Sequence, residues 1–300
     1  HIFAKAIMGS VLHRKLGNIS VSLAVTFLIG AVVGTTVGGY INRSIYDANP
    51  VLSDMFITSV YVIILGLLAY YAMSAYLKSR SKKVVVEEGA TRIAEEIPAM
   101  GKRLQSINIP PMLTFDESVT PGGRRISALF LVISGFIVGM AAAIMGVGGG
   151  FLTFPMFVYG LGVSSMTTVG TDIFQIVFTA GYAAIGQYAI YGFIFYTLAM
   201  GMLLGSLIGI QIGSIVTKVV PGTTIRGFYA ITVSAGFLNR VCALPDKLVK
   251  MGYITLSKDV IKIVDMIGNV GFFVIISTFA IWVFYCFFSN LSVLRPKEVN

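Results

Sequence analysis

The sequence predicts an all-α polytopic membrane protein, and three observations support this fold class. Of the 300 residues, 56% are hydrophobic and 12% are charged, and the mean hydropathy is +0.86, which is too apolar for an ordinary soluble domain. Between Ile126 and Thr217 the only ionisable side chain is that of Asp172. Glycines also recur at a constant offset in the two halves of the chain, which indicates an internal repeat.

Six apolar segments have close to the ~20 residues that a helix needs to cross a bilayer. They are Ile19–Ile41, Met55–Leu77, Thr167–Tyr188, Phe193–Thr217, Gly222–Val241 and Met266–Phe288. A further segment, Ser127–Gly162, is too long for one straight span and contains the stretch GVGGGFLTFP at its centre. We expect it to form a broken helix, which enters the membrane and returns if the repeats are inverted.

The formal net charge of +9 comes from basic residues that lie at the ends of apolar segments and in one long polar stretch. Because this distribution follows the positive-inside rule, we attribute it to membrane topology and expect no nucleic-acid partner. Residues 78–125 contain nine Lys and Arg residues, and we expect a water-exposed cytoplasmic linker that is partly helical around residues 84–104. In residues 242–300, the mixed segment Leu244–Ile263 predicts an interfacial amphipathic stretch before the final transmembrane helix.

Pairing each residue with the one 171 positions later defines the internal repeat. It matches Gly30, Gly34 and Gly38 with Gly201, Gly205 and Gly209. Residues 1–77 form the first repeat and residues 126–241 the second. The first has no counterpart of the glycine-rich break, so we expect it to be incomplete at its N-terminus by at least ~45 residues. Basic residues precede the span Ile19–Ile41 but follow its counterpart Phe193–Thr217, which favours inverted over parallel repeats.

The glycines spaced by four in both repeats form a stripe of small residues on one helical face. In a bilayer such a stripe allows two helices to pack closely, and this structural role is the main interpretation. A stripe that also lines a transport pathway is the alternative.

The glycine run itself, Gly146, Gly148, Gly149 and Gly150, fits neither a dinucleotide fingerprint nor a phosphate loop. A helix break at membrane depth is tolerated only where the backbone is buried in protein or faces a watery cavity. If a half-helix begins near Phe151, its free amides and positive dipole end favour an anion. The alternative is that the glycines only let two helices approach each other.

The next span has polar side chains on one face. Ser164 or Ser165 can cap its start, which places Asp172 roughly 12 Å along the helix, near the centre of the hydrocarbon core. The face is formed by Thr168, Asp172, Gln175 and Thr179. A lone intramembrane carboxylate indicates a functional site. Because no basic residue nearby in the sequence can pair with it, the alternative is an Asp172 that is protonated or bonded to freed backbone donors and serves structure only.

Other kinds of site find little support. Cys242 and Cys286 have apolar neighbours and no ligand at metal-binding spacing, so we expect neither a disulfide nor a metal site, and no cofactor. The membrane block contains no His, no Cys and no second titratable partner for Asp172, which is poor equipment for acid–base or nucleophilic chemistry. We therefore expect no enzymatic activity.

The combination of GVGGGFLTFP, VGTDIFQIVF and an apolar helix with G-x-x-x-G spacing resembles the sulfite exporter TauE/SafE permease family. The likeness covers about Gly135–Val241, with Val11–Leu77 as the remnant of the preceding repeat. It implies a multi-pass secondary transporter of small sulfur-containing or organic anions with two related halves. The family's glycine element matches Gly146, Gly148, Gly149, Gly150 and Pro155, and the motif that follows matches Gly170, Thr171 and Asp172. The chain departs from the family in lacking the first glycine element and in having the added segment Leu244–Asn300.

From these features we expect a permease that moves small anions, such as sulfite or sulfonates, across the cytoplasmic membrane of a prokaryote. Its partners are the lipid bilayer and the anionic substrate, and the oligomeric state stays open. The expected substrate-binding residues are Gly146, Gly148, Gly149, Gly150, Thr153, Thr168, Thr171 and Gln175. Asp172 is expected to carry a proton or to bond the helix end. The alternatives are a passive anion channel and a non-transporting subunit of a larger complex.

Overall fold

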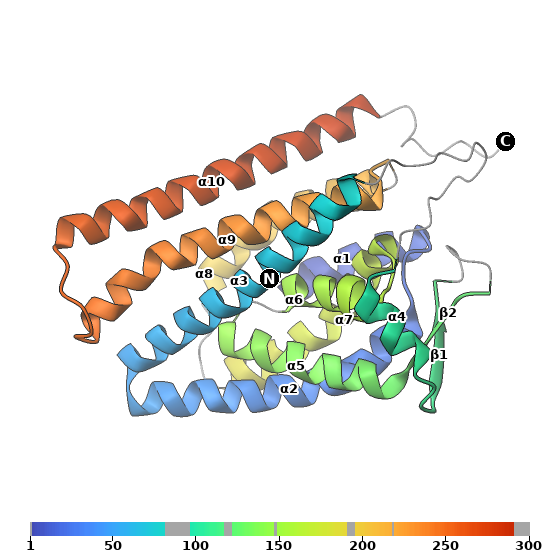
Figure 1. Ribbon diagram of the computed structural model, residues 1–300, viewed down its shortest axis with the longest axis horizontal. Coiled ribbons are helices and arrows are strands. Elements are labelled where there is room, and N and C mark those ends of the chain that lie inside the picture. The colour runs from blue at the N-terminus through green and yellow to red at the C-terminus, as the bar shows by residue number, and fades with distance from the viewer. Residues whose placement is uncertain are drawn as a thin grey trace. The chain divides into compact units, whose positions relative to one another are not determined.

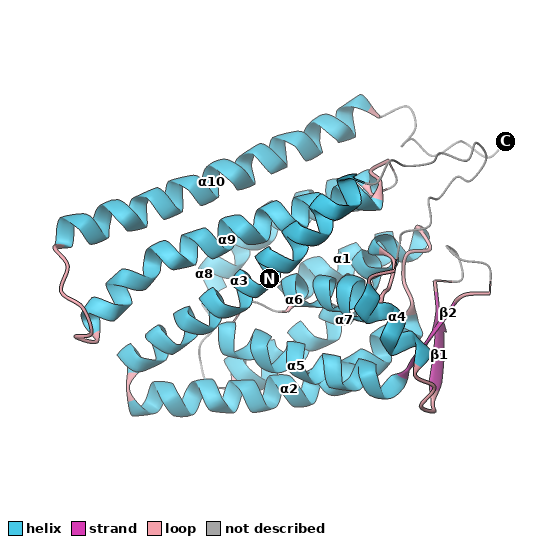
Figure 2. Cartoon of the chain, viewed as in Figure 1, coloured by secondary structure: helices cyan, strands magenta, loops and turns pink. Residues whose placement is uncertain are grey.

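The computed structural model describes residues 2–81, 97–116, 122–146, 149–190, 196–217 and 219–290. Within these ranges the chain is helical apart from one two-stranded sheet (Figure 2). Seven of the described helices are long and apolar enough to cross a membrane. The all-α polytopic fold class is therefore confirmed.

The elements follow one another along the chain as labelled in Figure 1. They are α1 (Ile2–Lys15), α2 (Val21–Ala48), α3 (Pro50–Ser81), α4 (Ala99–Ser106), β1 (Met112–Phe115), β2 (Arg124–Ser127), α5 (Ala128–Met145), α6 (Gly150–Pro155), η1 (Met156–Leu161), α7 (Ser165–Ala183), η2 (Ala184–Ala189), α8 (Tyr196–Val216), α9 (Gly222–Lys250) and α10 (Lys258–Ser289). The segments η1 and η2 are π-helical and continue α6 and α7 without a gap.

Each of the six predicted spans overlaps one of the long helices, and the seventh long helix is α5, the first part of the predicted broken segment. The segment Leu244–Ile263 differs from its expected form, because it is no separate amphipathic element. Its first part continues α9 as far as Lys250, and its last part begins α10 at Lys258. Pro245 lies inside α9 without ending it. The charged residues that suggested an interfacial segment are therefore the ends of two long helices.

The helix boundaries follow the predicted repeat. Adding 171 to the bounds of α3 gives residues 221–252, which compares with Gly222–Lys250 for α9. The same shift carries α2 to residues 192–219, around α8, and α1 to residues 173–186, within α7 and η2. Three consecutive helices thus recur in the same order and with similar lengths.

The chain divides into two compact units, which are described separately. The first comprises residues 1–39, 86–222 and 285–300. In it α1 runs antiparallel to α7, because Phe3 lies against Gly181 whereas Asn18 lies against Gly170. The α2 and α5 helices pack along each other (Figure 1), and the Phe27 ring meets the Phe157 ring edge-on, with centroids 5.0 Å apart. Burial of these apolar contacts stabilises the unit.

Part of the predicted linker is folded into this first unit. The β1 and β2 strands pair antiparallel, with Phe115 opposite Arg124, and the side chains of Phe115 and Ile126 are buried. The β2 strand leads directly into α5, where the Ser127 hydroxyl accepts a hydrogen bond from the amide of Leu129 at 3.2 Å. The expectation of a wholly water-exposed linker is therefore wrong for these residues. The helix expected around residues 84–104 is described only from residue 97 onward, where α4 forms.

The second unit comprises residues 40–85 and 223–284. Close approaches at glycines join its helices: Gly227 of α9 lies against Tyr76 of α3, and Gly268 of α10 lies against Cys242 of α9. An ion pair of 2.7 Å connects Lys247 of α9 to Asp54 of α3. These contacts follow the usual pattern of membrane helices, in which small residues allow close packing and polar groups join neighbouring helices.

Candidate functional site

The predicted helix break is present at the glycine run. The α5 helix ends at Gly146, whose φ of 71° is left-handed, and Gly149, with a φ of 84°, directly precedes α6. Side chains rarely adopt this conformation, so the backbone itself requires glycine at these two positions. Gly148 lies outside the described residues. Beyond the break, α6 and η1 end at Gly162, which has a φ of 74°.

The polar face predicted on α7 is buried. Ser164 caps the helix, as its hydroxyl accepts a hydrogen bond from the Thr167 amide. The side chains of Thr168, Thr171, Asp172 and Gln175 are all buried in the first unit. Gln175 donates its Nε2–H to Asp172 Oδ1 at 3.2 Å, and the Thr179 hydroxyl donates in turn to Gln175 Oε1 at 3.3 Å. The spacing read from the sequence thus corresponds to a connected row of polar groups.

The break and this polar row meet at one place. A side-chain carbon added at Gly150 would lie 3.2 Å from Asp172 Oδ2, so the carboxylate rests against the first residue of α6. Thr153, one turn further along α6, hydrogen-bonds the same carboxylate. Two segments that the sequence separates by about 20 residues therefore form one polar cluster, Gly150, Thr153, Asp172 and Gln175.

Two predicted site residues have other surroundings. The Thr171 hydroxyl accepts a hydrogen bond from the backbone amide of Ser20 at 3.0 Å, so it fastens the turn between α1 and α2 to α7. The Thr168 hydroxyl is fully buried and has no hydrogen-bond partner among the residues that the structure describes. Since leaving a buried hydroxyl unpaired costs free energy, Thr168 is a candidate contact for a polar ligand or water.

Sequence analysis found no basic partner for Asp172, but the fold provides one. Lys5, on α1, is near enough to Asp172 for a direct electrostatic interaction, although the two groups form no ion pair within 4 Å in the described structure. The signal that could have revealed it is the repeat, because Lys5 corresponds to Ile176, one turn after Asp172. A cation and a carboxylate thus share the region beside the break.

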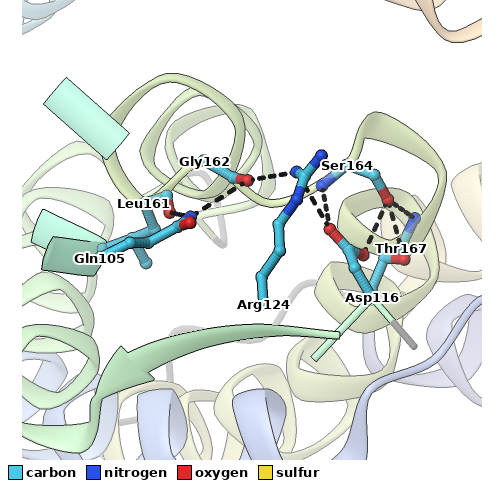
Figure 3. A network of polar contacts seen from close by, with 7 residues as sticks. All are labelled: Gln105, Asp116, Arg124, Leu161, Gly162, Ser164 and Thr167. Atoms are coloured by element: carbon cyan, nitrogen blue, oxygen red, sulfur yellow. Dashed lines mark hydrogen bonds and ion pairs between the residues drawn. The ribbon is translucent and has the colours of Figure 1, made fainter. Parts of the chain in front are cut away.

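A second polar network, which the sequence did not reveal, holds the far end of the broken segment (Figure 3). Asp116, just after β1, is completely buried, and its carboxylate accepts hydrogen bonds from the amide and the hydroxyl of Ser164, both at 2.9 Å. Arg124 of β2 lies 3.5 Å from Asp116 and donates to the carbonyl of Gly162 at 2.8 Å. Charge-assisted bonds of this kind are stronger than bonds between neutral groups.

Gln105 completes this network from α4, donating its Nε2–H to the carbonyl of Leu161 at 2.7 Å. Carbonyls at the end of a helix have no partner within the helix, and here side chains of the linker supply it. The turn between η1 and α7 is therefore fixed by residues of α4, β1 and β2 (Figure 3). Because the same turn starts α7, this network also sets the position from which Asp172 reaches Gly150.

Comparison with known proteins identifies the family. The family model described as Sulfite exporter TauE/SafE matches residues 1–239, from α1 to near the end of α9. Comparisons with curated proteins and with solved structures gave no match. The matched region includes the glycine break, the polar face of α7 and both sets of repeated helices. The chain therefore belongs to the sulfite exporter TauE/SafE family.

Proposed function

We propose that this protein is a secondary transporter that moves small anions, of the class of sulfite and sulfonates, across the cytoplasmic membrane of a prokaryote. Membership of a transporter family supports this proposal. The observation that carries it is the contact between the Asp172 carboxylate and Gly150 at the start of α6. An ionisable group beside a helix break at membrane depth is typical of transport sites.

In this proposal the anion binds beside the break and Asp172 does not hold it directly. Thr153 and Gln175 are hydrogen-bonded to Asp172, and Thr168 has a free buried hydroxyl in the described structure. When Asp172 is protonated, its bonds to these groups weaken and their donors become available to an anion. The positive charge of Lys5 then attracts the substrate. Gly146 and Gly149 shape the break, Gly148 belongs to the same proposed element, and Thr171 supports the site from the α1–α2 turn.

The test is anion flux into vesicles containing the purified protein, with sulfite, thiosulfate, sulfonates and carboxylates as substrates. In Asp172→Asn, the pH dependence of flux is expected to disappear while anion binding persists, because asparagine keeps the shape but carries no proton. Asp265→Asn is the matched control, since Asp265 is a carboxylate on α10 that accepts a hydrogen bond from Asn269 in the second unit. Unchanged pH dependence in Asp172→Asn would contradict the proton-carrying role.

A second variant tests the break. Gly149→Val places a β-branched residue at a φ of 84° and within 3.3 Å of the Ala142 side chain, so anion binding is expected to be lost. Gly271→Val on α10 is the control, because a side chain added there meets no described atom within 4 Å. Retained binding in a correctly folded Gly149→Val protein would remove the break from the site.

The two alternative functions give different results in the same vesicles. Counterflow, in which unlabelled anion on one side drives uptake of labelled anion, requires a carrier with alternating access. Saturable flux without counterflow would favour a passive anion channel. No flux of any tested anion, together with purification in fixed stoichiometry with another protein, would favour a non-transporting subunit.

A further inference from the structure

The glycine stripe of α2 is covered by α5. A side-chain carbon at Gly34 would overlap the carbonyl oxygen of Phe136, and Gly30 and Gly38 have the same relation to carbonyls one turn away on either side of α5. The contact is reciprocal, because Gly135 and Gly139 of α5 lie against the backbone of α2. The two helices therefore touch backbone to backbone over several turns, as G-x-x-x-G pairs in membranes do.

The corresponding stripe of α8 is uncovered. Gly201, Gly205 and Gly209 are the repeat equivalents of the three α2 glycines, yet side-chain carbons at these positions would meet no described atom within 4 Å. An open groove of about 640 Å³ lies along the start of this face, lined by Thr197, Leu198, Gly201 and Met202. The only polar member of this lining is Thr197, so the groove suits an apolar occupant.

Exposure to lipid alone does not account for this stripe. Each glycine in a helix interior costs about 1 kcal/mol relative to alanine, and small residues spaced by four contribute no packing against fluid lipid chains. In α2, the same spacing is offset by the close contact with α5. The α8 stripe therefore has the form of a packing surface without its partner.

The repeat indicates which helix fits the α8 surface. The chain order α5, α7, α8 and α9 has the counterpart α1, α2 and α3, so the described residues contain no counterpart of α5. The α5 helix precedes the second repeat but packs on α2 of the first. The equivalent helices α1 and α7 run antiparallel against each other, which supports inverted repeats. Exchange of the two repeats then places the counterpart of α5 on α8.

We propose that the glycine face of α8 is a docking surface for one membrane-spanning helix, the first-repeat counterpart of α5, which carries small residues four apart. The occupant's glycines meet the backbone of α8 as Gly135 and Gly139 meet that of α2. This is the helix that the repeat analysis expects ahead of His1. The proposal concerns assembly of the membrane domain and is independent of the transported substrate.

The test uses a synthetic peptide with the sequence of residues 128–145, flanked by lysines and labelled with an acceptor dye. The 300-residue chain, with Cys242 and Cys286 replaced by alanine, carries a donor dye on a cysteine introduced at Thr217, the end of α8. Both are placed in lipid vesicles, and energy transfer is measured as the peptide-to-lipid ratio increases. Saturable transfer is expected, and Gly205→Leu is expected to weaken it by about tenfold or more, the equivalent of 1.4 kcal/mol.

Two controls make the result specific. Gly271→Leu on α10 adds the same side chain at another glycine without described neighbours and is expected to leave the titration unchanged. A peptide with leucine in place of both Gly135 and Gly139 is expected to bind weakly to the unaltered chain. Equal binding to Gly205→Leu would overturn the proposal. So would transfer between two labelled copies of the chain that needs no peptide and disappears in Gly205→Leu, because the occupant would then be a second copy.

Discussion

Replacement of Asp116 by alanine tests whether the linker holds the broken helix in place. The variant removes a fully buried carboxylate that accepts two hydrogen bonds from Ser164, each of 2.9 Å, and that faces Arg124 at 3.5 Å. Hydrogen bonds to a charged group contribute about 1.5–3 kcal/mol each. Removal of one partner of a buried ion pair costs about 3–5 kcal/mol. Because these effects overlap, we expect Asp116→Ala to lower the free energy of unfolding by about 3–5 kcal/mol.

The assay is reversible denaturation in mixed micelles of detergent and SDS, followed by circular dichroism. Asp116→Asn keeps an acceptor for Ser164 but loses the charge, so its destabilisation is expected to lie between wild type and Asp116→Ala. The matched control is Asp246→Ala, which removes an exposed carboxylate paired with Lys250 at 2.8 Å and is expected to cost about 0.3–0.5 kcal/mol.

A double-mutant cycle with Ser164→Ala checks the assignment. If Asp116 acts through Ser164, the two effects are coupled by about 0.5–3 kcal/mol. The reasoning would be refuted if Asp116→Ala changed stability by no more than Asp246→Ala, or if the two substitutions were additive.

Two further predictions use the same denaturation assay. Gly34→Ala is expected to destabilise by about 1–3 kcal/mol, because its methyl group overlaps the carbonyl of Phe136, whereas Gly205→Ala in the chain alone is expected to change stability by less than about 0.5 kcal/mol; equal effects would contradict the difference between the two stripes. Gln105→Ala is expected to cost about 1 kcal/mol, since it removes the 2.7 Å bond to the carbonyl of Leu161, and an unchanged midpoint would show that water replaces this bond without loss.

The sequence by itself determined the membrane spans and the position of the break. Span length and hydropathy are local properties, and all six predicted spans overlap long helices. The glycine run also acts locally, because Gly146 and Gly149 adopt a backbone conformation that other residues disfavour. The face formed by Thr168, Asp172 and Gln175 followed from helical spacing alone, as did the serine cap of α7.

The tertiary structure decided which groups meet. The proximity of Lys5 to Asp172 joins helices far apart in the chain, and a charge near an apolar segment was interpreted only as a sign of topology. In the linker, Asp116 and Arg124 looked like ordinary solvated charges, because nothing in their neighbouring residues shows that a hairpin buries them against Ser164 and Gly162. Spacing along one helix fixes which side chains share a face, but the partner of that face depends on how distant helices pack. The two glycine stripes have the same spacing, and only the fold shows that α5 covers one and leaves the other open.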